Sequence, residues 1–182
     1  MRLTLGHANT IIAAALAEGA RLALAPLGVA VTDAGGHLIA FQRQDRSSTA
    51  RPQIAMAKAC GALALGVSSR RIGEMAAERP AFVTMFGQIA PQGVLPAAGG
   101  VIVVDEDGYA IGAVGVTGDT SDNDELCALA GIKAAGLVVK GCLAHPANRT
   151  RFNLSALVTT LTEDSAIAAA AITGDSRMPN SG

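Results

Sequence analysis

Aromatic side chains are scarce in this sequence, which has no Trp, one Tyr and four Phe among its 182 residues. Charged residues make up only 16% of the chain, and Lys and Arg form no basic run. Nucleic-acid-binding domains usually carry a basic stripe, so we expect no nucleic-acid partner. No apolar stretch is long and charge-free enough for a transmembrane helix, so we expect no membrane partner.

Cysteine is also scarce, and the number and spacing of the cysteines indicate the redox compartment. Cys60, Cys127 and Cys142 are odd in number and have no CxxC spacing, so they do not indicate a disulfide framework. A reducing cytoplasm is therefore the expected location. Half of the residues are hydrophobic, which excludes a disordered chain. With so few charges to cover this apolar content, we expect self-association into a dimer or a higher homo-oligomer.

The common catalytic and metal-binding motifs are absent. The sequence contains no GxSxG elbow, no Walker loop and no Rossmann fingerprint. His7, His37 and His145 are widely separated and fit neither HxH nor HExxH spacing, so no metal site is expected. Function must therefore be sought in residues that the fold brings together.

Hydrophobic periodicity predicts an α+β fold, with an antiparallel sheet of about five strands packed against helices. Residues 80–99 hold three prolines, and we expect irregular structure there with one short strand. The two predicted hairpins echo each other, since "GVAVTDAGGHLIAF" aligns with "GVIVVDEDGYAIGA". An internal duplication and convergence of strand–turn–strand patterns both explain the echo. The expected helices cover residues 4–24, 53–65, 68–79 and 121–140, and the expected hairpins cover residues 28–44 and 99–119.

The sequence pattern changes after residue 140. We expect one domain over residues 1–140, which is long enough for a sizeable core. Residues 141–182 form a C-terminal extension in which "AHPANRTRFN" is typical of a loop. One or two short helices and a disordered tail are expected beyond that loop.

Charged side chains gather at two places that suit a site. "FQRQDRSSTAR" sets Arg43, Arg46 and Arg51 near Asp45, and arginine forks suit carboxylates or propionates. A solvated strand end is the alternative interpretation. "GVTGDTSDND" joins a glycine-rich strand end to a helix N-terminus, where backbone N–H groups can hold an anion, although its aspartates, among them Asp124, oppose one.

Two histidines are further candidates. His37 follows a glycine turn, where it is either a solvated residue at the start of a strand or a base or metal ligand. His7 lies on the first helix, as an ordinary helix histidine or as a haem ligand. Six residues of strand separate His37 from Arg43 by roughly 20 Å, so these two side chains are expected at different ends.

Four blocks together resemble the GlcG/HbpS family, which includes the C-terminal domain of PduO-type proteins. The blocks are "LTLGHANTIIAAA", "VAVTDAGGHLIAFQRQD", "IAMAKACGAL" and "GGVIVVDEDGYAIGAVGVTGDTSDNDELCALAG", and the resemblance covers roughly residues 3–140. It implies an α/β sandwich with an antiparallel sheet and dimers that build larger assemblies. It also implies haem binding in some members and a place in catabolic operons for others. The matched polar positions are Arg43, Asp45, Lys58, Gly115, Thr117, Gly118 and Asp124.

Two main functional hypotheses follow from the residues and the resemblance. In the first, the protein binds haem or another tetrapyrrole, with His7 or Thr117 at or near the axial position and Arg43 paired with a propionate. Lys58 and Gly118 complete that set of cofactor-binding candidates.

In the second hypothesis, the protein is a small-molecule catabolic enzyme, such as an isomerase, a hydratase or a hydrolase. Arg43 or Arg51 would hold a substrate carboxylate, and the catalytic candidates Asp45, His37 and Asp124 would move protons. A non-catalytic assembly subunit is the third interpretation.

Overall fold

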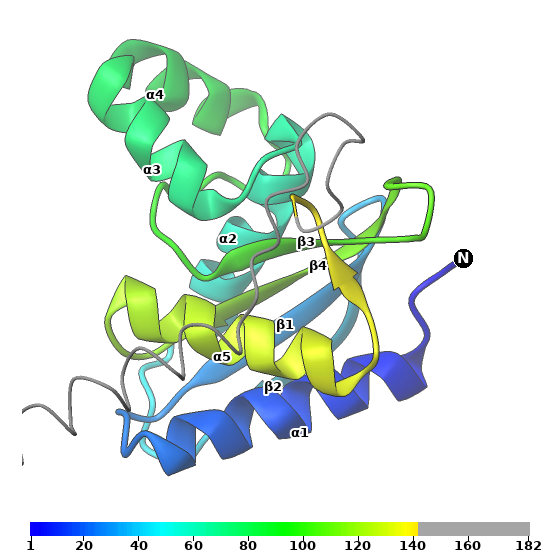
Figure 1. The fold of residues 1–182 in the computed structure, drawn as a ribbon. Coiled ribbons are helices and arrows are strands. Elements are labelled where there is room, and N and C mark those ends of the chain that lie inside the picture. Colours follow the sequence, from blue (N-terminus) through cyan, green and yellow to red (C-terminus); the bar gives the residue numbers. More distant parts are fainter. Residues whose placement is uncertain (142–182) are drawn as a thin grey trace, which may run out of the picture. The chain divides into compact units, whose positions relative to one another are not determined.

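Residues 1–141, the part of the chain that the computed structural model describes, contain five helices and five antiparallel strands (Figure 1). The helices are α1 (Leu5–Arg21), α2 (Arg51–Leu65), α3 (Ser69–Glu78), α4 (Pro80–Ile89) and α5 (Ser121–Ala134). The strands are β1 (Gly28–Asp33), β2 (Leu38–Arg43), β3 (Gly100–Val104), β4 (Ala110–Thr117) and β5 (Val138–Val139).

The five strands form one antiparallel sheet in the order β2-β1-β4-β3-β5. Each predicted hairpin is present, as β1–β2 and β3–β4, and the two hairpins join where β1 pairs with β4. Val31 lies opposite Val114 in that central pairing. The prediction of an α+β fold with an antiparallel sheet of about five strands is confirmed.

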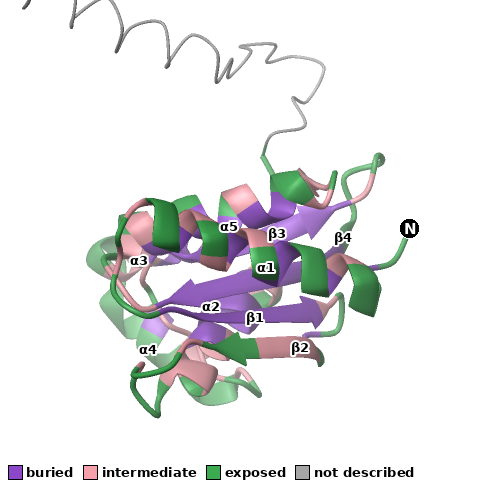
Figure 2. Cartoon of the chain, turned by 90° about the horizontal axis from the view of Figure 1, so that it is seen from below, coloured by how far each residue is buried: buried purple, intermediate pink, exposed green. Residues whose placement is uncertain are grey.

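Helices cover both faces of the sheet (Figure 1). Helices α1 and α5 pack against each other and against one face, and the larger core lies there. Helix α2 packs on the other face against β1, β3 and β4. Figure 2 shows that the central strands are buried, whereas the edge strand β2 is partly exposed. The main core residues are Ile11, Ile12, Val29, Val31, Val103, Val114, Val116, Cys127 and Ile132.

Small residues bring α2 unusually close to the sheet. A Cβ atom added at Gly115 of β4 would overlap the carbonyl oxygen of Ala55, and one added at Gly100 of β3 would overlap the backbone of Lys58. Glycine therefore occupies these two strand positions because helix backbone fills the space of a side chain. This close approach carries Lys58 into the interior.

Two sequence predictions were wrong. Residues 80–99 were expected to be irregular, but Pro80–Ile89 form α4. Proline is favoured in the first turn of a helix, where its missing N–H group costs no hydrogen bond, so Pro80 begins α4 as well as ending α3. The helix predicted to reach residue 140 ends at Ala134, because Gly136 adopts a φ of 69°. The chain then forms the short strand β5.

The predicted C-terminal extension, residues 141–182, lies outside the described residues apart from Gly141. Within the part that the structure describes, no helix combines the length and the apolar character needed to cross a membrane.

Candidate functional site

The turns of the two hairpins have the same hydrogen bonds. Asp33 Oδ1 accepts from the backbone N–H groups of Gly35 and His37, both at 2.9 Å. Asp105 Oδ1 accepts in the same way from Asp107 at 3.2 Å and Tyr109 at 2.9 Å. The echo in the sequence therefore reflects one turn design used twice, in which His37 and Tyr109 occupy equivalent positions.

His37 differs from Tyr109, its equivalent in the second hairpin, because the His37 imidazole contacts Asp33, the aspartate of its own turn. Nδ1 of His37 lies 3.2 Å from Oδ1 and 3.1 Å from Oδ2 of Asp33. The backbone N–H of His37 is the largest cause that holds the pKa of Asp33 below its usual value, so this carboxyl is ionised at neutral pH. In the neutral tautomer that donates from Nδ1 to this carboxylate, Nε2 is left as a free electron-pair donor. The imidazole is 83% exposed.

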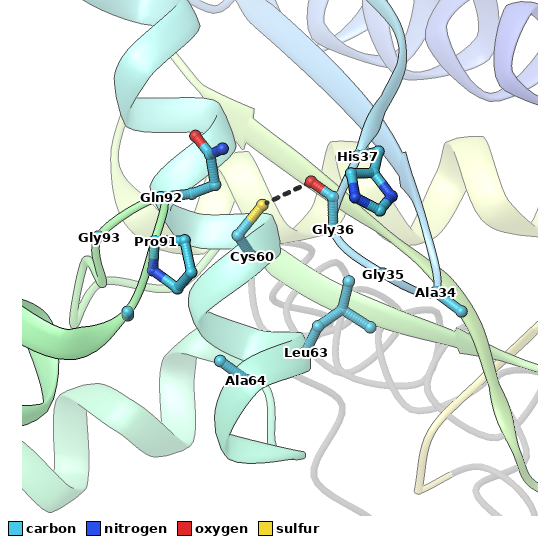
Figure 3. Close-up of a pocket in the computed structure, with 11 residues that line it drawn as sticks. Ala34, Gly35, Gly36, His37, Cys60, Leu63, Ala64, Pro91, Gln92 and Gly93 are labelled. Carbon is cyan, nitrogen blue, oxygen red and sulfur yellow. Dashed lines mark hydrogen bonds between the residues drawn. The ribbon is translucent and has the colours of Figure 1, made fainter.

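A cavity of about 300 Å³ lies beside His37 (Figure 3). Its wall combines the β1–β2 turn, the second half of α2 and the segment that follows α4. The Cys60 thiol donates a hydrogen bond to the carbonyl oxygen of Gly36 at 3.3 Å. Burial raises the pKa of this thiol, so it stays protonated at neutral pH. The lining residues are Ala34, Gly35, Gly36, His37, Cys60, Leu63, Ala64, Ala90, Pro91, Gln92 and Gly93.

The groups at this cavity fit a haem. An imidazole with a free Nε2 and a carboxylate on Nδ1 is the usual arrangement of a metal-bound histidine. The surrounding Leu63, Ala64 and Pro91 are apolar, as a porphyrin face requires. The volume is at the lower end of the range for small-molecule pockets, so the cavity would enclose part of such a ring.

His7 has a different role, since it takes part in the N-terminal cap of α1. The Thr4 hydroxyl accepts a hydrogen bond from the His7 backbone N–H, and Nδ1 of His7 accepts one from the Thr4 backbone N–H at 3.4 Å. In this reciprocal box the proton of the neutral imidazole sits on Nε2. Coordination of a metal through Nε2 would break the cap.

A second group of polar side chains is buried near the other end of β4. Lys58 Nζ donates to Asp124 Oδ2 at 2.7 Å and to the carbonyl oxygen of Val116 at 3.0 Å. The two side chains are 3% and 2% exposed. Desolvation raises the pKa of the Asp124 carboxyl, and the ammonium of Lys58 partly offsets that rise. Asp124 Oδ1 also accepts from the backbone N–H of Asp119 at 3.1 Å.

Arg51, the first residue of α2, extends this buried group. It donates to the hydroxyl of Thr117 at 2.9 Å and to the carbonyl oxygen of Gly118 at 3.3 Å. Gly99 adopts a φ of 117°, and a Cβ atom there would lie 3.0 Å from Lys58 Nζ. These contacts tie α2, β4 and the start of α5 together.

Arg43 and Asp45 lie in a shallow groove formed with the end of α1 and the chain that follows it. Both side chains are exposed, and Arg43 donates to the carbonyl oxygen of Ser48 at 3.4 Å. The groove is also lined by Ala20, Ala23, Leu24, Pro26 and Gln44.

The predicted site residues therefore fall into separate places. Lys58, Thr117, Gly118 and Asp124 come together in the interior, and Arg43 with Asp45 lies at the same end of the sheet. His7 and His37 lie at the end that carries the hairpin turns, on opposite faces. Sequence reasoning missed the pairing of Asp33 with His37, for which the DxxxH spacing within one turn was the available signal.

Among the described residues, no group of three or more His, Cys, Asp or Glu side chains is placed to hold a metal ion. This result leaves open the coordination of iron within a porphyrin, which supplies four ligands of its own.

Solved structures of known proteins share this fold. The chain resembles a solved PduOC:heme complex, with a TM-score of 0.68, 20% identity and coverage of 76% of this chain and 98% of that one. It resembles the protein ORFY of Klebsiella pneumoniae, with a TM-score of 0.67, 25% identity and coverage of 75% and 92%. It also resembles HbpS, with a TM-score of 0.64, 26% identity and coverage of 80% and 92%.

No curated protein matches the sequence. A family model described as the haem-degrading, HbpS-like protein matches residues 3–133, which is most of the described chain. The chain belongs to the HbpS-like family of haem-degrading proteins.

Proposed function

We propose that this protein binds haem at the cavity beside the β1–β2 turn, with Nε2 of His37 as the iron ligand. The observation that carries the proposal is the contact of Nδ1 with Asp33, which frees Nε2 on an exposed imidazole. The family to which the chain belongs supports haem as the ligand, and a protein of the same fold has been solved with haem.

Each residue of the cavity has a defined part in this proposal. Asp33 orients the imidazole and strengthens Nε2 as a donor. Leu63, Ala64 and Pro91 offer apolar surface and keep water from one face of the ring. Bound haem supplies a redox-active iron whose properties depend on its axial ligand and its surroundings.

The other predicted cofactor ligands are engaged elsewhere. Thr117 is only 3% exposed, and its hydroxyl accepts a hydrogen bond from Arg51. Lys58 is held by Asp124. Arg43 is separated from His37 by the length of β2, so a propionate partner must come from another part of the surface.

The test is a haemin titration of the purified protein followed at the Soret band. We expect saturable binding by the wild type, loss of the ligated spectrum in His37→Ala and retention of it in His7→Ala. Asp33→Asn should weaken binding by about 10-fold to 100-fold, because the carboxylate no longer supports the ligand.

Asp105→Asn is the matched control for Asp33→Asn, because it makes the same change in the equivalent turn, which lacks a histidine. Haem binding should be unchanged in this variant. Normal binding by His37→Ala would overturn the assignment of the ligand, and unsaturable binding by the wild type would overturn the haem proposal itself.

The enzyme hypothesis needs its acid–base groups and its arginines in one place. His37 lies at the opposite end of the sheet from Arg43 and Asp45, and Asp124 is held by Lys58. Haem binding therefore has the stronger support. A cytoplasmic location stays a prediction, and its test is fractionation of the cells that make the protein.

A further inference from the structure

Two arginine side chains start from neighbouring points at the end of the sheet that is remote from His37. Gly28 of β1 pairs with Arg43 of β2 on one side and with Thr117 of β4 on the other. Residues directly opposite each other in antiparallel strands point to the same face, with Cβ atoms about 4.5–5.5 Å apart. A Cβ atom added at Gly28 would lie 2.9 Å from the Cβ atom of Arg51, the first residue of α2. Arg51 therefore lies over Gly28, between Arg43 and Thr117.

The guanidinium of Arg51 has unused hydrogen-bond donors. Of the five N–H groups that a guanidinium carries, two donate here, to the hydroxyl of Thr117 at 2.9 Å and to the carbonyl oxygen of Gly118 at 3.3 Å. Nε of Arg51 is the only buried side-chain nitrogen or oxygen without a partner among residues 1–141. Buried polar groups are nearly always paired, so this donor lacks a partner that a ligand can supply. The side chain as a whole is only half-buried, which leaves part of it open to solvent.

Arg43 is also free to bind an anion. Its side chain is exposed, and its contact with the carbonyl oxygen of Ser48 is long at 3.4 Å. Within the described part of the chain, neither Arg43 nor Arg51 forms a salt bridge, and Asp45, the acidic residue of the same loop, pairs with neither of them. Two positive charges are thus held close together without an ion-pair partner from these residues.

The start of α2 adds backbone donors beside this pair of arginines. The first N–H groups of a helix have no partner within the helix. The N-cap residue of α2 is Ala50, which has no polar side chain to accept from them. Such N–H groups and the helix dipole both favour an anion, so they add to the positive potential of the two guanidinium groups.

We propose that Arg43 and Arg51, together with the N-terminus of α2, bind the phosphate group of a phosphate monoester. Arginine forks match the oxygens of a phosphate, and a monoester carries about two negative charges at neutral pH, which two neighbouring guanidinium groups balance. A single carboxylate would balance only one of them. The Phe41 ring, whose Cζ atom lies 3.4 Å from the Cβ position at Gly28, offers an apolar wall for the organic part of the ligand.

Isothermal titration calorimetry of the haem-free full chain with inorganic phosphate, at about 0.15 M ionic strength, tests this site. The wild type should bind phosphate saturably, with a Kd below about 1 mM. Arg43→Met removes one of the two forks and should weaken binding about 10-fold or more. Arg46→Met is the matched control, because it removes the same charge from an exposed residue of the same loop, and it should change the Kd by less than about 2-fold.

Arg51→Lys and acetate make the result sharper. The lysine keeps the charge of Arg51 without its planar fork, so this variant should also bind phosphate about 10-fold more weakly while circular dichroism shows that it is folded. Acetate carries one negative charge and should bind the wild type at least about 10-fold more weakly than phosphate does. Unsaturable binding of phosphate, equal losses in Arg43→Met and Arg46→Met, or equal affinities for acetate and phosphate would each overturn the proposal.

The phosphate site is independent of the proposed haem site, because Arg43 lies at the opposite end of β2 from His37. His37→Ala should therefore bind phosphate with the affinity of the wild type, and a failure of the haem proposal would leave the phosphate result unaffected. Loss of phosphate binding in a folded His37→Ala variant would overturn the assignment to the arginine pair.

Discussion

Lys58 and Asp124 link three elements of this fold. Their side chains join α2 to α5, and the ammonium also binds the backbone of β4. Each charge would be costly in the interior without the other. The pair therefore adds a buried electrostatic link to the packing of α2 against the sheet.

Breaking this pair should be strongly destabilising. Lys58→Met leaves the Asp124 carboxylate without its ion-pair partner, and we expect a loss of about 3–5 kcal/mol in the free energy of unfolding, measured by urea denaturation. The double variant Lys58→Met/Asp124→Leu removes both charges and should lose clearly less. A double variant at least as unstable as the single one would contradict this account.

Asp119 gives a prediction for acid conditions. Its carboxylate accepts hydrogen bonds from Asn123 Nδ2 at 2.7 Å, Ala25 N at 3.0 Å and Thr120 N at 2.8 Å. The contact with Asn123 is the largest cause of the lowered pKa of Asp119. These contacts lower the pKa of Asp119 from 3.8 to about 2. A carboxyl with a lowered pKa stabilises the fold above its unfolded-state pKa and loses that contribution as pH falls through the folded value.

The free energy of unfolding should therefore decrease between about pH 4 and about pH 2. In Asp119→Asn, which cannot titrate, this decrease should be smaller. Urea denaturation at a series of pH values measures both slopes, and identical slopes would show that Asp119 does not contribute.

At the scale of elements, the close approach of α2 to the sheet requires glycine at positions 100 and 115. Gly115→Ala would place a methyl group against the carbonyl oxygen of Ala55 on α2. We expect a loss of about 1–3 kcal/mol or more in the free energy of unfolding, because helix backbone has little freedom to move away.

Gly87→Ala on α4 is the matched comparison. A Cβ atom at Gly87 would meet nothing within 4 Å. Since alanine is the better helix former, this variant should be more stable by up to about 1 kcal/mol. Denaturation of both variants side by side checks the pair of predictions, and equal effects would mean that packing of α2 does not limit residue 115.

The elements that sequence patterns predicted correctly are those with a local signal. The β1–β2 and β3–β4 hairpins were predicted because glycine turns stand between runs of Val, Ile and Ala. Helix α4 was missed because Pro80 ends one helix and begins the next, so its usual meaning as a breaker was misleading. Strand β5 was missed because its two residues gain their structure only by pairing with β3.

The site was less predictable than the fold for a physical reason. Lys58 and Asp124 are 66 residues apart, and they meet only because α2 and α5 both pack at the end of β4. The resemblance marked them as polar positions and gave no contact between them. The Asp33–His37 pair is local, yet an aspartate before a glycine turn is so common that the histidine four residues later attracted no particular weight.

At the scale of the whole molecule, the prediction of a domain over residues 1–140 can be tested by truncation. A chain that ends at Gly141 keeps every strand and helix described above. It should unfold in one cooperative transition and keep the far-ultraviolet circular dichroism expected for its helices and strands. A truncated chain that fails to fold would place part of the domain beyond residue 141.

The order of strands also determines what happens while the chain is being made. Strand β1 finds its partner β2 at once, but its other partner is β4, which ends at Thr117, 84 residues after Asp33. At roughly 5–20 residues per second, translation needs on the order of ten seconds to cover that distance. During this interval the nascent β1–β2 hairpin has an unpaired apolar edge, so the period of greatest exposure to misassembly falls before β4 emerges from the ribosome.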